Sequence, residues 1–219
     1  MLAELHCHTR YSSDSLVLPA RLLEVCRRRG IDKVAITDHN TIEGALEAAR
    51  LDPDRVIVGE EIKTLKGELI AYFVREEIPP GLEPEDAIER LRSQGAFISV
   101  SHPLDRMRSK AWSIDDLRGI LPLVDALEVF NARNWCSRSN RRAACLAAEY
   151  GKLGTAGSDA HTYAEIGRAT MRMPDFHNVD EFRHALATAH IAGRRSTHLV
   201  HLASRYATVR KSLGWRPPQ

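Results

Sequence analysis

The chain has 219 residues, of which 43% are hydrophobic and 27% are charged, and its formal net charge is +2 at pH 7. These values are typical of an ordinary globular protein with one good-sized core. A charge this small is no argument by itself for a nucleic-acid partner. No apolar stretch has the character of a signal peptide or the length of a membrane span, so we expect a cytoplasmic protein without membrane contact.

Short apolar runs alternate with amphipathic stretches along most of the chain. Strands are predicted at residues 2–7, 33–37, 56–59, 69–74, 96–100, 126–130 and 153–156, with a later one at 169–173. Helices are predicted at residues 19–29, 41–50, 84–94, 113–121, 137–150 and 179–191, and several begin at proline or stop at glycine. This alternation predicts an α/β fold with a largely parallel sheet, open or closed into a barrel. About seven strands are few for a regular eight-stranded barrel.

The C-terminal residues differ in composition from the rest. No acidic residue follows Glu181, whereas seven arginines and lysines do. We therefore separate a main domain at residues 1–195 from a basic tail at 196–219. Two interpretations of the tail stay open: a solvated basic helix packed on the domain, and a binding element for an anionic substrate or an acidic partner.

Nearly every predicted strand ends in a side chain that can bind metal. The first ends in His6 and His8, which are two residues apart and therefore point to the same face. The carboxyl ends of parallel strands meet at one edge, so these groups should converge. Imidazole together with carboxylate favours zinc, manganese or iron, and a set this large suits two or three ions. The groups at the other strand ends are Asp38 and His39, Glu60 and Glu61, His102, Asn131, and Asp159 and His161.

These residues resemble the motifs of the polymerase-and-histidinol-phosphatase (PHP) superfamily of metal-dependent phosphoesterases. The resemblance covers residues 1–195, and its motifs occur in the family's order. They are specific as a set, although none would suffice alone. The matching segments are His6-Cys7-His8-Thr9, Ser13-Asp14-Ser15, Thr37-Asp38-His39-Asn40, Gly59-Glu60-Glu61-Ile62-Lys63-Thr64, Ser101-His102-Pro103 and Gly157-Ser158-Asp159-Ala160-His161.

The resemblance implies a distorted seven-stranded (β/α)7 barrel with two or three divalent metal ions (manganese, zinc or iron) at its mouth. In this reading Glu61 bridges two ions, and Glu60 points to the opposite face in a structural role. The residues implied as metal ligands are His6, His8, Asp14, His39, Glu61, His102, Asp159 and His161.

Two positions depart from the commonest family pattern. Many relatives carry a metal-binding histidine where this chain has Glu68, in the segment Gly67-Glu68-Leu69. We assign Glu68 as a ligand; the alternative is a weaker or vacant site. Asn131 stands near the position at which some members have histidine or cysteine, so a substrate contact or a weak metal contact is expected there. The third metal depends on these two positions more than the first two metals do.

The implied activity is hydrolysis of a phosphoester, with a small-molecule or nucleotide phosphate monoester as substrate and a metal-bridging hydroxide as nucleophile. Arg133 and Arg106 are predicted to bind phosphoryl oxygens. Asp38 is predicted to orient His39 or to shuttle a proton. Two alternatives stay open: a phosphodiesterase or exonuclease that acts on short nucleic acids, and a non-catalytic, metal-stabilised partner domain. The remaining histidines match no motif and are expected at the surface or in packing: His177, His184, His190, His198 and His201.

Overall fold

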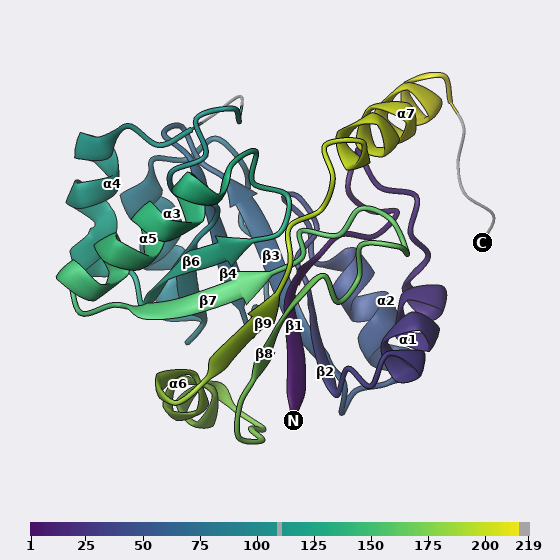
Figure 1. Cartoon of the computed structure of the whole chain (residues 1–219), viewed down its shortest axis with the longest axis horizontal. Coiled ribbons are helices and arrows are strands. Elements are labelled where there is room, and N and C mark those ends of the chain that lie inside the picture. The colour runs from purple at the N-terminus through teal and green to yellow at the C-terminus, as the bar shows by residue number, and fades with distance from the viewer. Residues whose placement is uncertain (109–110, 215–219) are drawn as a thin grey trace.

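The computed structural model describes residues 1–108 and 111–214, in which the chain forms nine strands, seven α-helices and one short 3-10 helix (Figure 1). The strands are β1 (Leu2–Cys7), β2 (Lys33–Ile36), β3 (Val56–Lys63), β4 (Glu68–Tyr72), β5 (Phe97–Val100), β6 (Ala126–Asn131), β7 (Leu153–Gly157), β8 (Ala169–Arg172) and β9 (His190–Gly193). The helices are α1 (Pro19–Arg28), α2 (Glu43–Leu51), α3 (Pro84–Ser93), α4 (Ile114–Ile120), α5 (Ser137–Glu149), α6 (Val179–Ala187) and α7 (Val200–Ser212).

The strands form one sheet in the order β7-β6-β5-β4-β3-β2-β1-β8-β9. The sheet curls until its first seven strands nearly close. At the seam, Ala160, just beyond β7, bridges to Cys7 of β1. The backbone of Ala160 also donates to the carbonyl of His6 and accepts from the amide of His8. The seven-stranded barrel is therefore confirmed, with β8 and β9 added beyond β1.

The expectation of a largely parallel sheet is wrong, because half of the strand pairs are antiparallel. The pairs β3–β4, β4–β5, β1–β8 and β8–β9 run antiparallel, and the other four run parallel. Only residues 64–67 separate β3 from β4, and a parallel crossover needs about a dozen residues or more. The chain must therefore turn straight back. As a result the first residue of β4, Glu68, lies opposite the last residue of β3, Lys63.

The predicted helix at 179–191 is also wrong at its C-terminal end, over its last four residues. Helix α6 ends at Ala187, and the chain then forms β9, which pairs antiparallel with β8. The outer edge of β8 offers a complete row of backbone hydrogen-bond partners, and ladder bonds to it replace those of a longer helix. Ile191, within β9, is β-branched, which favours this extended conformation.

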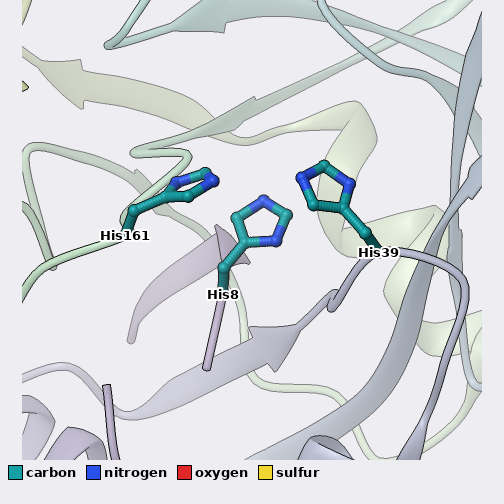
Figure 2. A group of neighbouring side chains, drawn as sticks. All are labelled: His8, His39 and His161. Carbon is teal, nitrogen blue, oxygen red and sulfur yellow. The ribbon is translucent and has the colours of Figure 1, made fainter. Parts of the chain in front are cut away.

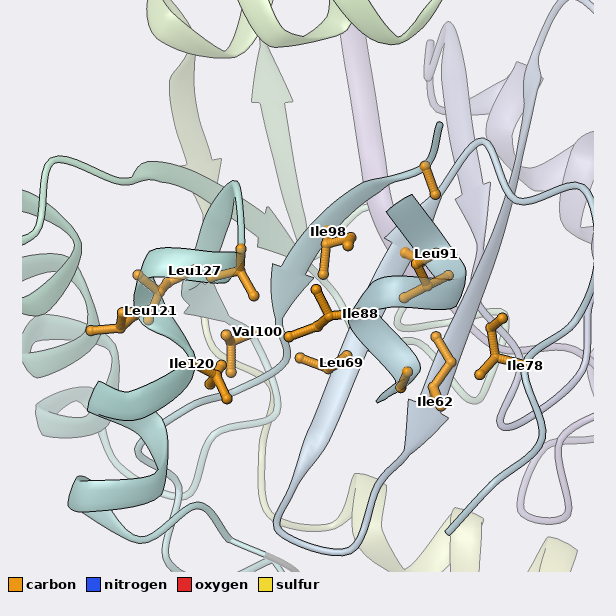
Figure 3. Packing of buried hydrophobic residues seen from close by; sticks show 14 of the residues in the cluster. Ile62, Leu69, Ile78, Ile88, Leu91, Ile98, Val100, Ile120, Leu121 and Leu127 are labelled. Carbon is orange, nitrogen blue, oxygen red and sulfur yellow. The ribbon is translucent and has the colours of Figure 1, made fainter. Parts of the chain in front are cut away.

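Apolar side chains hold the helices against the sheet. Figure 1 shows α3, α4 and α5 on one flank and α1 and α2 on the other. Ile88 and Leu91 of α3 pack with Leu69, Ile98 and Val100 of the strands beneath them (Figure 3). Each such buried side chain stabilises the fold by about 1.5–3 kcal/mol.

At the end of the barrel opposite the metal ligands, α6 inserts an aromatic plug. The ring of Phe182 lies edge-on to Phe97 at a centroid separation of 5.0 Å and also contacts Tyr72 at 5.4 Å. All three side chains are buried. Because this end is filled, the open end of the barrel is the one at which the ligands converge.

The predicted tail contains α7, which lies over that open end; residues 215–219 fall outside the described part of the chain. Lys211 donates hydrogen bonds to the backbone carbonyls of Arg10, at 2.6 Å, and Ser12. Ala207 is the one residue of α7 that is fully buried. The part of the chain that the structure describes contains no helix with both the length and the apolarity that a membrane crossing requires.

Candidate metal centre

Four predicted ligands form the middle of a buried cluster. His6 ends β1 with His8 just beyond it, Glu61 comes from β3, and Asp159 follows β7. The Nε2 atoms of His6 and His8 are 3.0 Å apart, and each lies 3.4 Å from Oε2 of Glu61. Asp159 Oδ1 lies 3.3 Å from His8 Nε2. All four residues are fully buried, as polar groups rarely are without a shared partner.

The backbone around Asp159 is built for this approach. A Cβ atom at Gly157 would collide with the side chain of His6, so only glycine lets β7 come this close to β1. Asp159 itself has a φ of 53°, in the left-handed region that non-glycine residues avoid. The bridge from Ala160 to β1 holds that conformation in place. The Gly157–His161 motif is therefore a turn that aims Asp159 and His161 back at the first strand.

On one side of the cluster the ligands are mainly histidines. The rings of His8, His39 and His161 turn toward one another, and one nitrogen from each lies within 4.8 Å of the others (Figure 2). Asp14 joins them from the loop after β1. Its Oδ2 is 3.0 Å from His161 Nε2, and its Oδ1 is 3.6 Å from His39 Nε2. The four groups form the histidine side of the centre.

On the opposite side the ligands are mainly carboxylates. His102 Nε2 lies 3.0 Å from Glu61 Oε1 and 3.4 Å from Glu68 Oε2. The antiparallel turn between β3 and β4 brings Glu68 to the barrel mouth as the first residue of its strand. Glu61, Glu68 and His102 form the carboxylate side. Glu60 lies away from them, where it accepts a hydrogen bond from the amide of Ile78.

The donor atoms fit divalent metal ions. Oε2 of Glu61 and the Oδ1 atoms of Asp14 and Asp159 are buried and accept no hydrogen bond within the described residues, although His39 Nδ1 lies 3.0 Å from Glu61 Oε2. Burial raises the pKa of Glu61, but His6 and His39 lower it well below its usual value. Burial raises the pKa of Asp159 too, and Arg108 and His6 lower it well below its usual value. Anionic oxygens without donors, placed among imidazole nitrogens, are ligands that suit zinc, manganese or iron.

Glu128, which sequence reasoning missed, supports the ligands from behind. Its Oε1 is 2.8 Å from His6 Nδ1, and its Oε2 accepts hydrogen bonds from the backbone amide of His102 and the side-chain amide of Asn131. A carboxylate on the far nitrogen of a metal-binding histidine orients the ring and increases its basicity. The one signal in the sequence is a glutamate within an otherwise apolar strand, Leu127-Glu128-Val129-Phe130.

Asn131 and Asp38 have different surroundings from those predicted. The amide of Asn131 donates to Glu128 and to Asp159 Oδ2, and its oxygen accepts from the backbone of Arg133. It therefore braces ligands. The carboxylate of Asp38 accepts hydrogen bonds from the backbone and hydroxyl groups of both Thr9 and Ser12.

Of the two roles predicted for Asp38, these contacts do not support the orientation of His39, and the proton shuttle stays a prediction. Within residues 1–108 and 111–214 no ring nitrogen of His39 is among its hydrogen-bond partners. Its four hydrogen bonds point the carboxylate into the loop after β1, which also carries Asp14. Asp38 thus holds a ligand-bearing loop in place.

The two predicted phosphate-binding arginines occupy different environments. Arg133 is 4% exposed, and its guanidinium lies 3.4 Å from the carbonyl oxygen of Asp159 and 3.6 Å from Glu165 Oε1. Arg106 is exposed, and no contact joins it to the cluster among the residues described, so its role in binding phosphate stays a prediction. Arg108 instead contacts Asp159 Oδ2. The loop turns between positions 106 and 108, and no sequence pattern marks which arginine points inward.

His198 and His201, expected at the surface or in packing, stack on Trp135 at 4.7 Å beside the centre. Burial, together with Arg133 and Arg108, lowers the pKa of His201 to about 4, so its ring is neutral at pH 7. His184 and the other two unmatched histidines, His177 and His190, are exposed.

A nearly closed α/β barrel with a histidine and carboxylate cluster at its mouth defines a class of metal-dependent proteins. The PHP domain model matches residues 4–96, and the PHP-associated model matches residues 137–190. An uncharacterised protein of Methanocaldococcus jannaschii is 40% identical over 146 residues, which are 60% of this chain and 82% of that protein. The chain belongs to the PHP family.

Solved structures agree with this fold. A two-domain protein from Bacteroides vulgatus that contains a predicted PHP-like metal-dependent phosphoesterase aligns with a TM-score of 0.72 at 19% identity, over 89% of this chain and 65% of that one. A lesion-specific endonuclease from Pyrococcus furiosus aligns with a TM-score of 0.65 at 16% identity, over 100% of this chain and 68% of that one. At these identities the likeness shows the shared fold.

Proposed function

We propose that this protein is a metal-dependent phosphoesterase that hydrolyses the phosphate monoester of a small molecule or nucleotide. One observation carries the proposal: three sets of ligand atoms overlap, the first and second through His8 and the second and third through Glu61. Shared ligands of this kind suit two or three neighbouring ions of manganese, zinc or iron. When bound, such ions supply a nucleophilic water at neutral pH and neutralise charge on phosphoryl oxygens.

The protein's own residues bind and orient the phosphate. The guanidinium of Arg133 borders the cavity next to Asp14 and His161, where its positive charge attracts phosphoryl oxygens. Arg108 compensates the charge of Asp159 and lines the same cavity. The two arginines therefore favour an anionic substrate on the histidine side of the centre.

The size of the cavity favours a small substrate over a polymer. Its volume is about 430 Å³, toward the lower end of the roughly 300–1,000 Å³ that is typical of small-molecule sites. The likeness to a lesion-specific endonuclease keeps phosphodiester cleavage as the second candidate. The two candidates predict different substrate preferences, so one assay separates them.

The test begins with metal-free protein, which is reconstituted with manganese, zinc or ferrous iron. Its turnover is measured on p-nitrophenyl phosphate, bis-p-nitrophenyl phosphate, mononucleotides and short oligonucleotides. We expect metal-dependent monoester hydrolysis that chelator removes and fresh metal restores. Preference for the bis-ester or the oligonucleotides would assign a phosphodiesterase. Stoichiometric metal binding without turnover of any substrate would leave the non-catalytic partner domain as the function.

A further inference from the structure

The cavity beside the metal centre has two unlike walls. One wall belongs to the barrel and contains the ligands Asp14 and His161. The other belongs to α7, whose residues Leu202, Arg205 and Thr208 face the cavity. A substrate that reaches the histidine side of the centre therefore touches α7 as well.

Contacts from two separate parts of the barrel hold α7 in this position. Ser204 accepts a hydrogen bond of 2.5 Å from Arg133, which follows β6. Lys211 binds the carbonyls of Arg10 and Ser12, in the loop that also carries Asp14. The helix thus joins a predicted phosphate-binding arginine to a ligand-bearing loop.

A stacked group closes the N-terminal end of the same wall. The ring of His201 lies parallel to Trp135, with an interplanar angle of 1° and a centroid separation of 4.7 Å. His198 stacks on Trp135 at the same separation, with an angle of 17°. The indole and both imidazoles line the cavity, which makes this end of the wall firm and largely flat.

The wall is not part of the pattern that defines the family. The two matching family models end at residues 96 and 190, whereas α7 begins at Val200. The metal ligands lie on the barrel, and the appended helix supplies surfaces that the cluster alone lacks. In such barrels selectivity resides in the segments around the mouth rather than in the strands.

The charged side chains around the cavity indicate which class of ligand it binds. Arg108, Arg133 and Arg205 line it, and Asp14 is the one acidic side chain among the described residues around it. Nε of Arg133 is buried and has no acceptor in the described structure. Arg205 is exposed on α7 and forms no ion pair within residues 1–108 and 111–214. Because Arg108 pairs with Asp159 and Arg133 lies beside Glu165, Arg205 is the cavity arginine whose charge is left for a ligand.

We propose that α7 is the substrate-selecting wall of this centre, and that the cavity beneath it takes the leaving group of a small phosphate monoester that carries a second anionic group. This proposal rests on the proposed phosphoesterase function. Arg133 binds the phosphoryl group, and Arg205 binds the second anion, a carboxylate or another phosphate. The apolar surfaces of Trp135 and Leu202 pack on the carbon skeleton between them.

The test compares two substrates of similar size in the full-length protein. 3-Phosphoglycerate has a carboxylate where glycerol 3-phosphate has a hydroxymethyl group. We expect the wild-type protein to prefer 3-phosphoglycerate by about tenfold in kcat/KM, because a charge-assisted contact is roughly twice as strong as a neutral one. Arg205→Ala should remove the preference by lowering kcat/KM for 3-phosphoglycerate far more than for glycerol 3-phosphate. Arg194→Ala, which removes an exposed arginine outside this cavity, is the matched control.

The proposal also implies that α7 limits the size of the substrate. Lys211→Met tests this, because it removes the hydrogen bonds between α7 and the loop after β1. We expect bulky mononucleotides to gain in kcat/KM relative to p-nitrophenyl phosphate in this variant. An unchanged ratio would mean that α7 does not limit substrate size.

Binding gives a readout that does not need turnover. Titration calorimetry with 3-phosphoglycerate and glycerol 3-phosphate should give the same order of affinities, and Arg205→Ala should abolish the difference. Equal affinities in the wild-type protein, or an equal loss for both ligands in Arg205→Ala, would overturn the proposal for Arg205 even if p-nitrophenyl phosphate is hydrolysed. Absence of turnover with selective binding intact would instead contradict the proposed function and leave the selecting wall in place.

Discussion

The two sides of the metal centre differ in donor chemistry and in access. The histidine side has three imidazoles and one carboxylate, and its His39 and Asp14 side chains are 20% and 26% exposed. The carboxylate side has two carboxylates and one imidazole, and its His102 and Glu68 side chains are 3% and 10% exposed. The first side faces the cavity and the second faces the barrel wall.

This difference has its origin in the topology. The histidine side is built from segments that follow β1, β2 and β7, where parallel strands end. The carboxylate side is built where β3, β4 and β5 alternate in direction, which brings Glu68 from the start of a strand to the mouth. Imidazole and carboxylate donors prefer different ions. We therefore expect the metals of this centre to bind with unequal affinities, the histidine side favouring zinc or iron and the carboxylate side favouring manganese.

The largest expected effect comes from His8, which belongs to both the histidine set and the central set. His8→Ala should reduce kcat/KM by about 10³-fold or more, because loss of a shared ligand disturbs two ions that act on one phosphoryl group. Elemental analysis of the same variant should show a reduced metal content. His184→Ala removes an exposed histidine and should behave as wild type. Full activity in His8→Ala would mean that the centre is wrongly assigned.

The next effect concerns Glu128, which contacts a ligand in the middle of the centre and another on its carboxylate side. Glu128 binds the ring of His6 and the backbone of His102, so Glu128→Gln should weaken metal binding by about 10–100-fold. Competition with a chromophoric chelator measures this change. Glu149→Gln on the exposed face of α5 provides the control, and equal affinities in the two variants would show that Glu128 has no part in the centre.

A smaller effect is expected at Glu68, and it tests the inequality of the two sides directly. Glu68→Ala should remove one metal per chain, since His102 and Glu61 alone leave that position short of ligands. Glu68→His should raise zinc affinity there by about tenfold, because an imidazole suits zinc better than a lone carboxylate does. Elemental analysis and chelator titration report both changes. If stoichiometry stays the same in Glu68→Ala, Glu68 is no ligand.

The smallest effect separates two arginines of one loop. Arg106→Ala should change kcat/KM by less than about twofold, as is usual for an exposed side chain remote from the site. Arg108→Ala should reduce kcat/KM by more than Arg106→Ala does, because it leaves the buried carboxylate of Asp159 without its cation. The kcat/KM values of the two variants, measured side by side, show which arginine acts at the site. A greater loss in Arg106→Ala would support the prediction for Arg106.

Much of the barrel could be predicted because its signals are local. Proline starts, glycine stops and short apolar runs placed most of the elements within a few residues, and His6 and His8 marked the edge at which ligands gather. The direction of β4 and the existence of β9 depend on which neighbouring edge is free. That is a property of the assembled sheet, so periodicity alone could not reveal either.

The residues of the site also differ in how far the sequence could predict them. Ligands at strand ends were visible because strand order carries them to one mouth. The residues that support these ligands were not visible in the sequence. Glu128 contacts His6 from 122 positions away. Arg108 and Arg106 lie in the same loop, and only the turn of its backbone determines which of them faces the centre. The placement of α7 over the mouth depends on Ser204 and Lys211, which no motif distinguishes from other polar residues in a basic helix.

The position of β1 within the sheet also has a consequence for how the protein is made. This strand is synthesised before the other eight, yet one of its neighbours is β8, with Leu2 opposite Arg172. At about 5–20 residues per second, β1 waits on the order of 10–30 s for that neighbour. His6 and His8 are exposed throughout this interval, before Asp159 and His161 exist. Metal loading is therefore expected to follow synthesis of the chain through β8, and early contact with metal would trap partial sites.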